Sequence, residues 1–159
     1  MKIFLASDHG GIVLKNKILE HLRNNKSEVI DMGAYENDPS DDYPDFVVPT
    51  MQNVTDNTDS RGIVLCRNGV GVCVLANKFN GVRCGLSFNT EHVIKARTDD
   101  DINVLSIPAE YVSPIEAFKM VDLFLSTPFS NAERHLRRLE RIYDVESGNL
   151  PEHDEDQQS

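Results

Sequence analysis

Short, continuously apolar runs alternate along this chain with longer segments whose apolar residues recur every three to four positions. The first pattern predicts buried strands, and the second predicts amphipathic helices. The expected strands are residues 2–7, 28–32, 62–66, 82–87 and 103–107. The expected helices are residues 12–24, 43–57, 69–78, 90–98, 114–126 and 130–144. Thr90 is the expected N-cap of its helix, and Ser113 with Pro114 has the pattern of another capped helix start.

The strand-then-helix unit is repeated five times, which predicts an α/β fold. We expect a single-domain, doubly wound, Rossmann-like sheet of five parallel strands with helices on both faces. Ligands of such sheets bind outside the carboxyl ends of the strands. The loops expected near that edge are residues 8–11, 66–72 and 87–89 and the stretch before Asn103.

Length and composition narrow the class of protein. A chain of 159 residues can bury a core without disulfides or metals, and we expect a domain over residues 1–144 followed by an acidic, disordered tail over residues 145–159. No apolar run approaches the roughly 20 residues of a membrane span, and the first residues lack a signal-peptide pattern. Cys66, Cys73 and Cys84 form neither an even-numbered disulfide set nor a CxxC pair, so we expect a cytoplasmic protein.

The distribution of charge points to a small anionic ligand. A net charge of −10 argues against a nucleic-acid surface, which needs a basic excess. One basic cluster nevertheless occurs within eight residues: Arg134, Arg137, Arg138 and Arg141. Arg134, Arg138 and Arg141 are spaced to share a helix face and could grip a phosphate. The alternative is a solvated helix face balanced by Glu133 and Glu140.

The segment from Leu65 to Val72, with the sequence Leu-Cys-Arg-Asn-Gly-Val-Gly-Val, places a thiol where an apolar strand ends and a glycine-bearing turn opens a helix. The N–H groups at a helix start favour anions and favour a thiolate over a thiol. This combination suits chemistry through an oxyanion, such as an enediolate or a tetrahedral adduct. The alternative is that Cys66 is a small core residue.

A second polar turn, Asp8-His9-Gly10-Gly11, follows the first strand. His9 can donate to a phosphate or sugar oxygen, and Asp8 can accept from hydroxyls, although Asp8 could equally be a helix cap. A third glycine and the acidic residue of a dinucleotide site are missing, and no Walker lysine follows Gly69 or Gly71. The Asp run at residues 99–101 lacks EF-hand spacing, so we expect no metal site there.

Several motifs occur together and in order. They are Asp8-His9-Gly10-Gly11 with Lys15, Asp42-Tyr43-Pro44, Cys66-Arg67-Asn68-Gly69-Val70-Gly71, Ala76-Asn77-Lys78, Gly81-Val82-Arg83, Asn103-Val104-Leu105 and Arg134-His135-Leu136-Arg137-Arg138. Over residues 1–143 the chain resembles the family of type B ribose-5-phosphate isomerases and galactose-6-phosphate isomerase subunits.

The resemblance implies the interconversion of ribose 5-phosphate and ribulose 5-phosphate in the pentose phosphate pathway, without a metal or organic cofactor. It also implies a homodimer or tetramer with active sites shared between subunits. The net charge and the lack of a long apolar run predict no nucleic-acid or membrane partner. Cys66 would move the proton between C1 and C2. The implied oxyanion donors are the amides of Gly69, Val70, Gly71 and Val72. The implied sugar contacts are Asp8, His9, Tyr43 and Asn103. The implied phosphate ligands, from the partner subunit, are Arg134, His135 and Arg138.

Three positions depart from the family pattern. Asn68 replaces a hydroxyl residue that polarises the substrate, and its amide can still donate and accept. Asp99 replaces a ring-opening histidine, so either it, Asp8 or spontaneous opening would serve. Glu110 replaces an arginine that contacts phosphate, and would repel phosphate unless it points away or pairs with Arg137 or another base. The alternatives are therefore a hexose-6-phosphate isomerase of the allose or galactose type, or a non-catalytic sugar-phosphate-binding relative.

Overall fold

The computed structural model describes residues 1–149, which form five strands and six helices. The strands are β1 (Lys2–Ser7), β2 (Val29–Asp31), β3 (Ser60–Cys66), β4 (Cys84–Leu86) and β5 (Val104–Pro108). The helices are α1 (Ile12–Asn24), α2 (Pro44–Asp56), α3 (Val70–Ala76), α4 (Thr90–Asp100), α5 (Pro114–Ser126) and α6 (Glu133–Glu146). Most of the tail expected over residues 145–159 lies outside the described residues.

All five strands are parallel and follow the order β2-β1-β3-β5-β4. This confirms the predicted α/β class and the doubly wound sheet. Ser7 pairs with Leu65 in the β1–β3 ladder, and Cys66 pairs with Pro108 in the β3–β5 ladder. The chain order of the strands reverses between β1 and β3, which is the point where open α/β sheets bind ligands.

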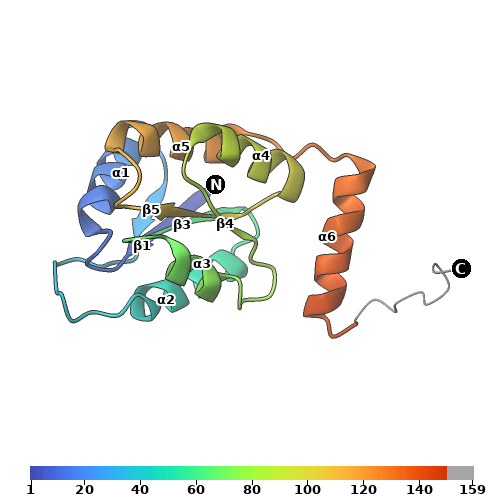
Figure 1. The fold of residues 1–159 in the computed structure, drawn as a ribbon, viewed down its shortest axis with the longest axis horizontal. Helices are drawn as coiled ribbons and strands as arrows, with labels where there is room; N and C mark the ends of the chain where they lie inside the picture. The colour runs from blue at the N-terminus through green and yellow to red at the C-terminus, as the bar shows by residue number, and fades with distance from the viewer. Residues whose placement is uncertain (150–159) are drawn as a thin grey trace, which may run out of the picture.

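Helices cover both faces of the sheet, as predicted (Figure 1). Helices α1, α4 and α5 form one layer, and α2 and α3 form the other. Successive strand residues serve opposite cores: Leu5 packs towards the first layer, whereas Phe4 packs towards the second. Because both faces are covered, the central strands are continuously apolar rather than alternating.

Several element boundaries differ from the predictions. Strands β2 and β4 have three residues each, because both lie at sheet edges and pair on one side only. The N-cap of α4 is Asn89 rather than Thr90: its Oδ1 accepts the N–H of His92 at 2.9 Å. The cap at the start of α5 is confirmed, because Ser113 Oγ accepts the N–H of Glu116 at 3.2 Å.

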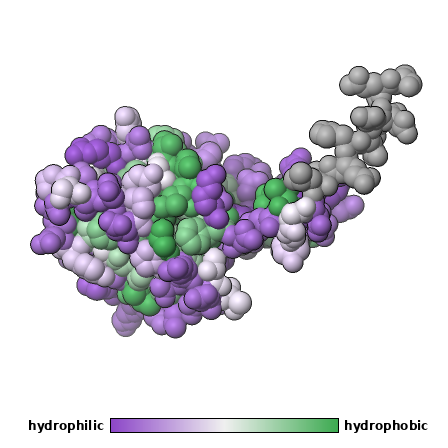
Figure 2. Space-filling view, turned by 90° about the horizontal axis from the view of Figure 1, so that it is seen from below, coloured by the Kyte–Doolittle hydropathy of each residue, from purple (hydrophilic) through white to green (hydrophobic). Residues whose placement is uncertain are grey.

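Helix α6 stands apart from the other elements (Figure 1). Its one buried side chain is His135. Seen from below, α6 projects to one side of the rest of the protein. Apolar side chains gather in the middle of that larger part (Figure 2). None of the helices within residues 1–149 combines the length and the apolar character that a membrane crossing requires.

A buried ion pair fixes α1 to β2 beside the carboxyl edge of the sheet. The Lys15 side chain is fully buried, and its ammonium donates to Asp31 Oδ1 and to the Ala34 carbonyl, both at 2.7 Å. A buried ammonium is stable only when such acceptors compensate for its lost hydration.

We expect Lys15→Ala to lower the free energy of unfolding by about 3–5 kcal/mol, because the Asp31 carboxylate loses its charge partner. The measurement is urea unfolding, with Lys17→Ala on the exposed face of α1 as the matched control. Equal midpoints for the two variants would show that the buried pair contributes nothing to stability.

Candidate active site

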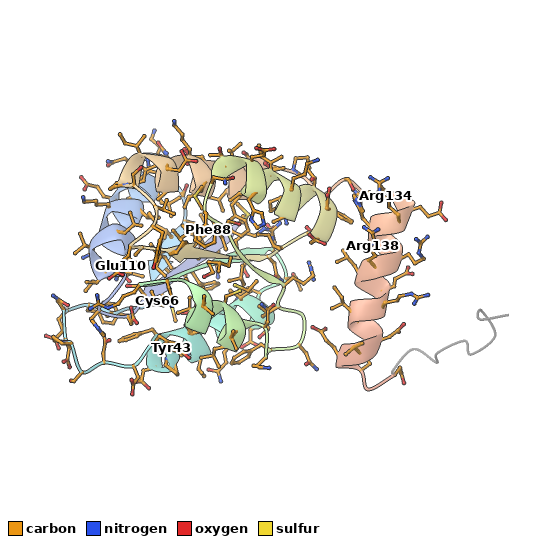
Figure 3. All side chains as sticks on the ribbon, in the orientation of Figure 1. Tyr43, Cys66, Phe88, Glu110, Arg134 and Arg138 are labelled. Atoms are coloured by element: carbon orange, nitrogen blue, oxygen red, sulfur yellow. The ribbon has the colours of Figure 1, made fainter. Side chains whose placement is uncertain are left out.

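The carboxyl edge of the sheet brings together residues from three separate turns. Asp8 and His9 follow β1, Cys66 ends β3, and Tyr43 directly precedes α2. Figure 3 shows Cys66, Tyr43 and Glu110 on one side of the molecule. The same view shows Arg134 and Arg138 on α6, at the opposite side.

The Cys66 sulfur lies between the apolar core and the polar turn that follows β3. The residue is 6% exposed, and its Sγ accepts the N–H of Gly69 at 3.2 Å. The Asn68 Oδ1 lies 3.8 Å from the same sulfur. The Gly69 N–H supports negative charge on the sulfur, and the Asn68 oxygen accepts from a protonated thiol, so the turn offers a partner to the thiolate and to the thiol.

The shape of this turn depends on Gly69. Its φ of +73° lies in the left-handed region, and a Cβ there would come within 2.6 Å of the Leu86 side chain. Two of the four predicted oxyanion donors are used inside the turn. The Gly69 N–H donates to Cys66 Sγ, and the Val70 N–H donates to Asn68 Oδ1 at 3.0 Å. Gly71 and Val72, in the first turn of α3, keep N–H groups that have no acceptor within the helix.

Tyr43 lies against the start of α3. A Cβ on Gly71 would come 2.8 Å from its ring and 3.1 Å from its hydroxyl, so glycine is what allows the ring to approach. The phenol is half-buried and borders the turn that holds Cys66. The contact of Tyr43 with the sugar stays a prediction.

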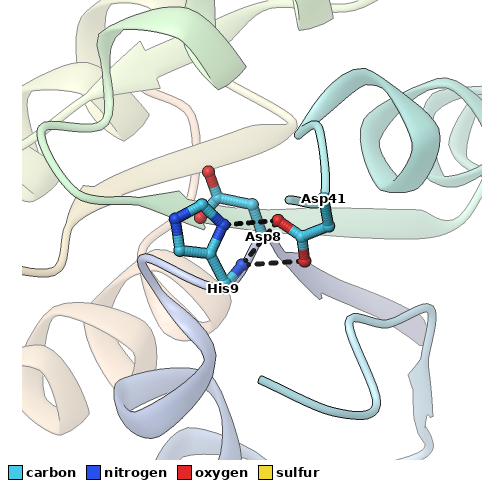
Figure 4. Close-up of side chains that lie close together, drawn as sticks. All are labelled: Asp8, His9 and Asp41. Atoms are coloured by element: carbon cyan, nitrogen blue, oxygen red, sulfur yellow. Dashed lines mark hydrogen bonds and ion pairs between the residues drawn. The ribbon is translucent and has the colours of Figure 1, made fainter. Parts of the chain in front are cut away.

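Asp8, His9 and Asp41 form a polar cluster at the end of β1 (Figure 4). His9 Nδ1 lies 2.6 Å from Asp41 Oδ1, and the His9 backbone N–H donates to the same carboxylate. Burial raises the pKa of Asp8; the Asp41 charge adds to this rise and the His9 charge opposes it. One ligand atom from each of the three residues lies within 4.8 Å of the others, but the His9–Asp41 hydrogen bond accounts for the cluster without a cation.

Asn103 does not lie at this edge, so the placement of the stretch before it was wrong. Asn103 precedes β5 and therefore lies at the amino end of the sheet. Its Nδ2 donates to the Gly81 carbonyl and its Oδ1 accepts the Arg83 N–H, both at 2.8 Å. The amide ties two loops together rather than facing Cys66.

Asp99 and the predicted phosphate ligands are also remote from Cys66 within one chain. Asp99 lies at the carboxyl end of α4, and its carboxylate is 4.0 Å from His135 Nδ1. The Thr98 hydroxyl donates to Asp99 and lowers its pKa. His135 is buried, with Nδ1 2.7 Å from Ser130 Oγ, whereas Arg134 and Arg138 are exposed.

Glu110 pairs with a basic residue, as predicted, but the partner is Arg67 and not Arg137. Glu110 Oε1 accepts from Arg67 Nη1 at 2.7 Å. Arg67 stands between Cys66 and Asn68, so the ion pair borders the candidate site.

Comparison with known proteins identifies the family. The sequence profile of the family described as "Ribose/Galactose Isomerase" matches residues 3–142. The chain belongs to this family. Among curated relatives, ribose-5-phosphate isomerase B of Mycolicibacterium paratuberculosis is 37% identical over 146 residues, covering 92% of this chain and 92% of that protein. The probable ribose-5-phosphate isomerase B of Mycoplasma pneumoniae is 42% identical, covering 88% and 91%.

Solved structures of ribose-5-phosphate isomerase B share the fold of this chain. The enzyme of Mycoplasma genitalium with bound ribulose-5-phosphate has a TM-score of 0.88 and 41% identity, over 92% of this chain and 96% of that one. The Thermotoga maritima enzyme has a TM-score of 0.86 and 38% identity, over 91% and 98%.

Two residues of the candidate site were not predicted as site residues. Asp41, which holds His9, lies in the acidic loop between β2 and α2. The sequence feature that could have indicated Asp41 is its place in an acidic loop that follows β2 and so begins at the carboxyl edge of the sheet. Arg67, which holds Glu110, lies inside the motif itself. Its signal was a long basic side chain beside the candidate base.

A second thiol, that of Cys73 on α3, differs chemically from the thiol of Cys66, which ends β3. Cys73 Sγ lies 3.4 Å from the Cys84 carbonyl oxygen and 3.6 Å from Asn77 Nδ2. Hydrogen bonding from the Cys84 side chain, assisted by Asn77 and opposed by burial, lowers the pKa of Cys73 to about 7, whereas the pKa of Cys84 is raised.

We therefore expect iodoacetamide to alkylate Cys73 with a rate that rises as the pH increases through about 7, because the thiolate is the nucleophile. Peptide mass spectrometry across pH 5–10 measures the site and the rate, with Cys73→Ser as the control. Faster labelling of Cys84, or a rate that rises only near the ordinary cysteine pKa of about 8.5, would contradict this assignment.

Proposed function

We propose that this chain interconverts ribose 5-phosphate and ribulose 5-phosphate. The observation that carries the proposal is its likeness, at 41% identity and a TM-score of 0.88, to a ribose-5-phosphate isomerase B structure with bound ribulose-5-phosphate. The family profile and the curated relatives support the same isomerase activity. Residues 1–144 form the catalytic domain in this proposal, and the cytoplasmic pentose phosphate pathway is its setting.

Cys66 is the base in the proposed reaction. Its thiolate removes the proton from C2 of the open-chain aldose, and the electron pair moves into a C1–C2 double bond, leaving negative charge on the carbonyl oxygen. The proton of the C2 hydroxyl then passes to the C1 oxygen, and Cys66, whose proton exchanges with solvent, delivers a proton to C1, which yields the ketose with its carbonyl at C2. The N–H groups of Gly71 and Val72 support the developing oxyanion, and the Asn68 amide supports the turn.

Asp8 is the better candidate for opening the sugar ring. Burial raises its pKa towards the range in which a carboxyl both takes and gives a proton, and it lies at the same sheet edge as Cys66. The pKa of Asp99 is lowered, which moves it away from that range. His9, fixed by Asp41, and Tyr43 contact the sugar hydroxyls in this assignment.

The phosphate ligands predicted on α6, which are Arg134, His135 and Arg138, come from a second subunit of a homodimer, or of a tetramer built from dimers. Within one chain, Cys66 lies on the opposite side of the molecule from Arg134 and Arg138. Cys66 and these arginines of the same chain therefore cannot contact one five-carbon substrate together. A cavity of about 790 Å³ separates the inner face of α6 from the body. Four apolar side chains of α6 remain exposed: Leu136, Ile142, Tyr143 and Val145. Such a helix is suited to packing on a partner.

We expect Cys66→Ala to lower kcat for ribose 5-phosphate by at least about 10³-fold, because the base is removed, while the dissociation constant changes by a factor of a few. Ketose formation measures turnover, and calorimetry measures binding. Cys73→Ala is the matched thiol control. Full activity of Cys66→Ala would remove Cys66 from the mechanism. Turnover by the wild-type protein of a hexose 6-phosphate in place of ribose 5-phosphate would identify the chain as a hexose-6-phosphate isomerase.

Subunit mixing tests whether the site is shared. Arg138→Ala is expected to raise KM more than it lowers kcat, because it acts on the remote phosphate. When Cys66→Ala and Arg138→Ala proteins are mixed and allowed to exchange subunits, each mixed dimer contains one intact site. At subsaturating substrate we expect up to about one quarter of wild-type activity, since half of the dimers are mixed and each has one of two sites.

No gain in activity over the unmixed variants, although mass spectrometry shows mixed dimers, would contradict a shared site. Mixing Cys66→Ala with Cys66→Ser is the matched control, since no combination of these chains contains a complete site.

A further inference from the structure

Arg67 lies beside Cys66 in a turn that is held on two sides. The Arg67 carbonyl accepts the Glu110 N–H, and the Cys66 carbonyl accepts the Ala109 N–H, both at 3.0 Å. The turns after β3 and β5 therefore lie side by side, and Figure 3 shows Glu110 close to Cys66.

The Arg67 side chain is directed by its neighbours although it is 62% exposed. Its stem passes over Gly10, where a Cβ would come within 2.5 Å of Arg67 Cγ. Its Nη1 donates to Glu110 Oε1 at 2.7 Å. The guanidinium is thus held at the carboxyl edge, between the Asp8-His9-Gly10-Gly11 turn and Glu110.

Most of the donors of this guanidinium are available to a ligand. An arginine side chain offers five N–H donors in a planar fork. Glu110 Oε1 is the one side-chain acceptor that the described residues give it, and Nη1 is the atom used. The Nε and Nη2 donors remain for an anion, and a guanidinium fork matches two phosphate oxygens.

The other charges at this edge leave Arg67 as the cation suited to a phosphate. Asp8, Asp41 and Glu110 are acidic there, and His9 is engaged with Asp41. The nearby Lys15 ammonium is fully buried and bound to Asp31. A doubly charged phosphate ester placed at this edge needs a compensating cation, and Arg67 supplies it next to the base.

We propose that Arg67 binds the substrate phosphate from the same chain that supplies Cys66, and that Glu110 is a positioning residue for its guanidinium. The proposal rests on the sugar-phosphate isomerase function proposed above. It explains how an acidic residue is accommodated at position 110: Glu110 is hydrogen-bonded to Arg67 Nη1, which leaves the remaining donors of the guanidinium for the phosphate.

The test compares steady-state kinetics of Arg67→Ala, Arg67→Lys, Glu110→Gln and Glu110→Ala with ribose 5-phosphate, and competitive inhibition by inorganic phosphate. We expect Arg67→Ala to raise both KM and the inhibition constant of phosphate about 10- to 100-fold, with kcat within about threefold. Arg67→Lys keeps the charge but loses the fork, so smaller increases are expected. Glu110→Gln retains an acceptor and should stay within about twofold, whereas Glu110→Ala should raise both constants.

Arg23→Ala, on the exposed end of α1, is the matched arginine control, and circular dichroism checks the fold of every variant. If folded Arg67→Ala keeps the wild-type KM and phosphate inhibition, the role of Arg67 is contradicted. Loss of kcat with an unchanged phosphate constant would also contradict it. A wild-type protein that does not turn over ribose 5-phosphate would instead contradict the proposed function, so the two failures are distinguishable.

Discussion

The parallel pairing of β1 with β3 at the centre of the sheet is the constraint on which the site depends. It sets Ser7 opposite Leu65, so the turns that begin at Asp8 and at Cys66 leave the sheet together. The pairing of β3 with β5 adds the turn that carries Glu110. Because these strands are buried on both faces, the turns are anchored by the rigid part of the molecule, while their polar groups face outward.

The distribution of chemistry over the chain is asymmetric. The carboxyl edge carries a thiol, an N–H donor on that thiol, a carboxyl with a raised pKa and one guanidinium. The arginines of α6 and the lowered-pKa carboxyl of Asp99 lie elsewhere. One chain therefore holds the groups proposed for proton transfer and the guanidinium proposed to bind phosphate, and in the proposed arrangement a second chain completes the site.

The sequence predicted the central elements well because their signals are local. Continuous apolar runs identified β1 and β3, and Ser113 with Pro114 identified the start of α5. The edge strands were predicted too long, since pairing on one side is a property of the sheet and not of the run. Asn103 was predicted at the carboxyl edge of the sheet, which was wrong. It directly precedes β5, and a residue before a strand of a parallel sheet lies at the amino edge. The partners Asp41 and Arg67 arise from tertiary contacts that no local pattern encodes.

The central claim is that Cys66 moves a proton through an enediolate, and deuterium incorporation tests it most directly. Purified protein converts ribose 5-phosphate to ribulose 5-phosphate in D₂O, and the deuterium content of the sugar carbons C1 and C2 is measured by NMR. The account predicts deuterium at C1 of the ketose with the wild-type protein, and none above background with folded, substrate-binding Cys66→Ala. Incorporation by Cys66→Ala at the wild-type rate would contradict it.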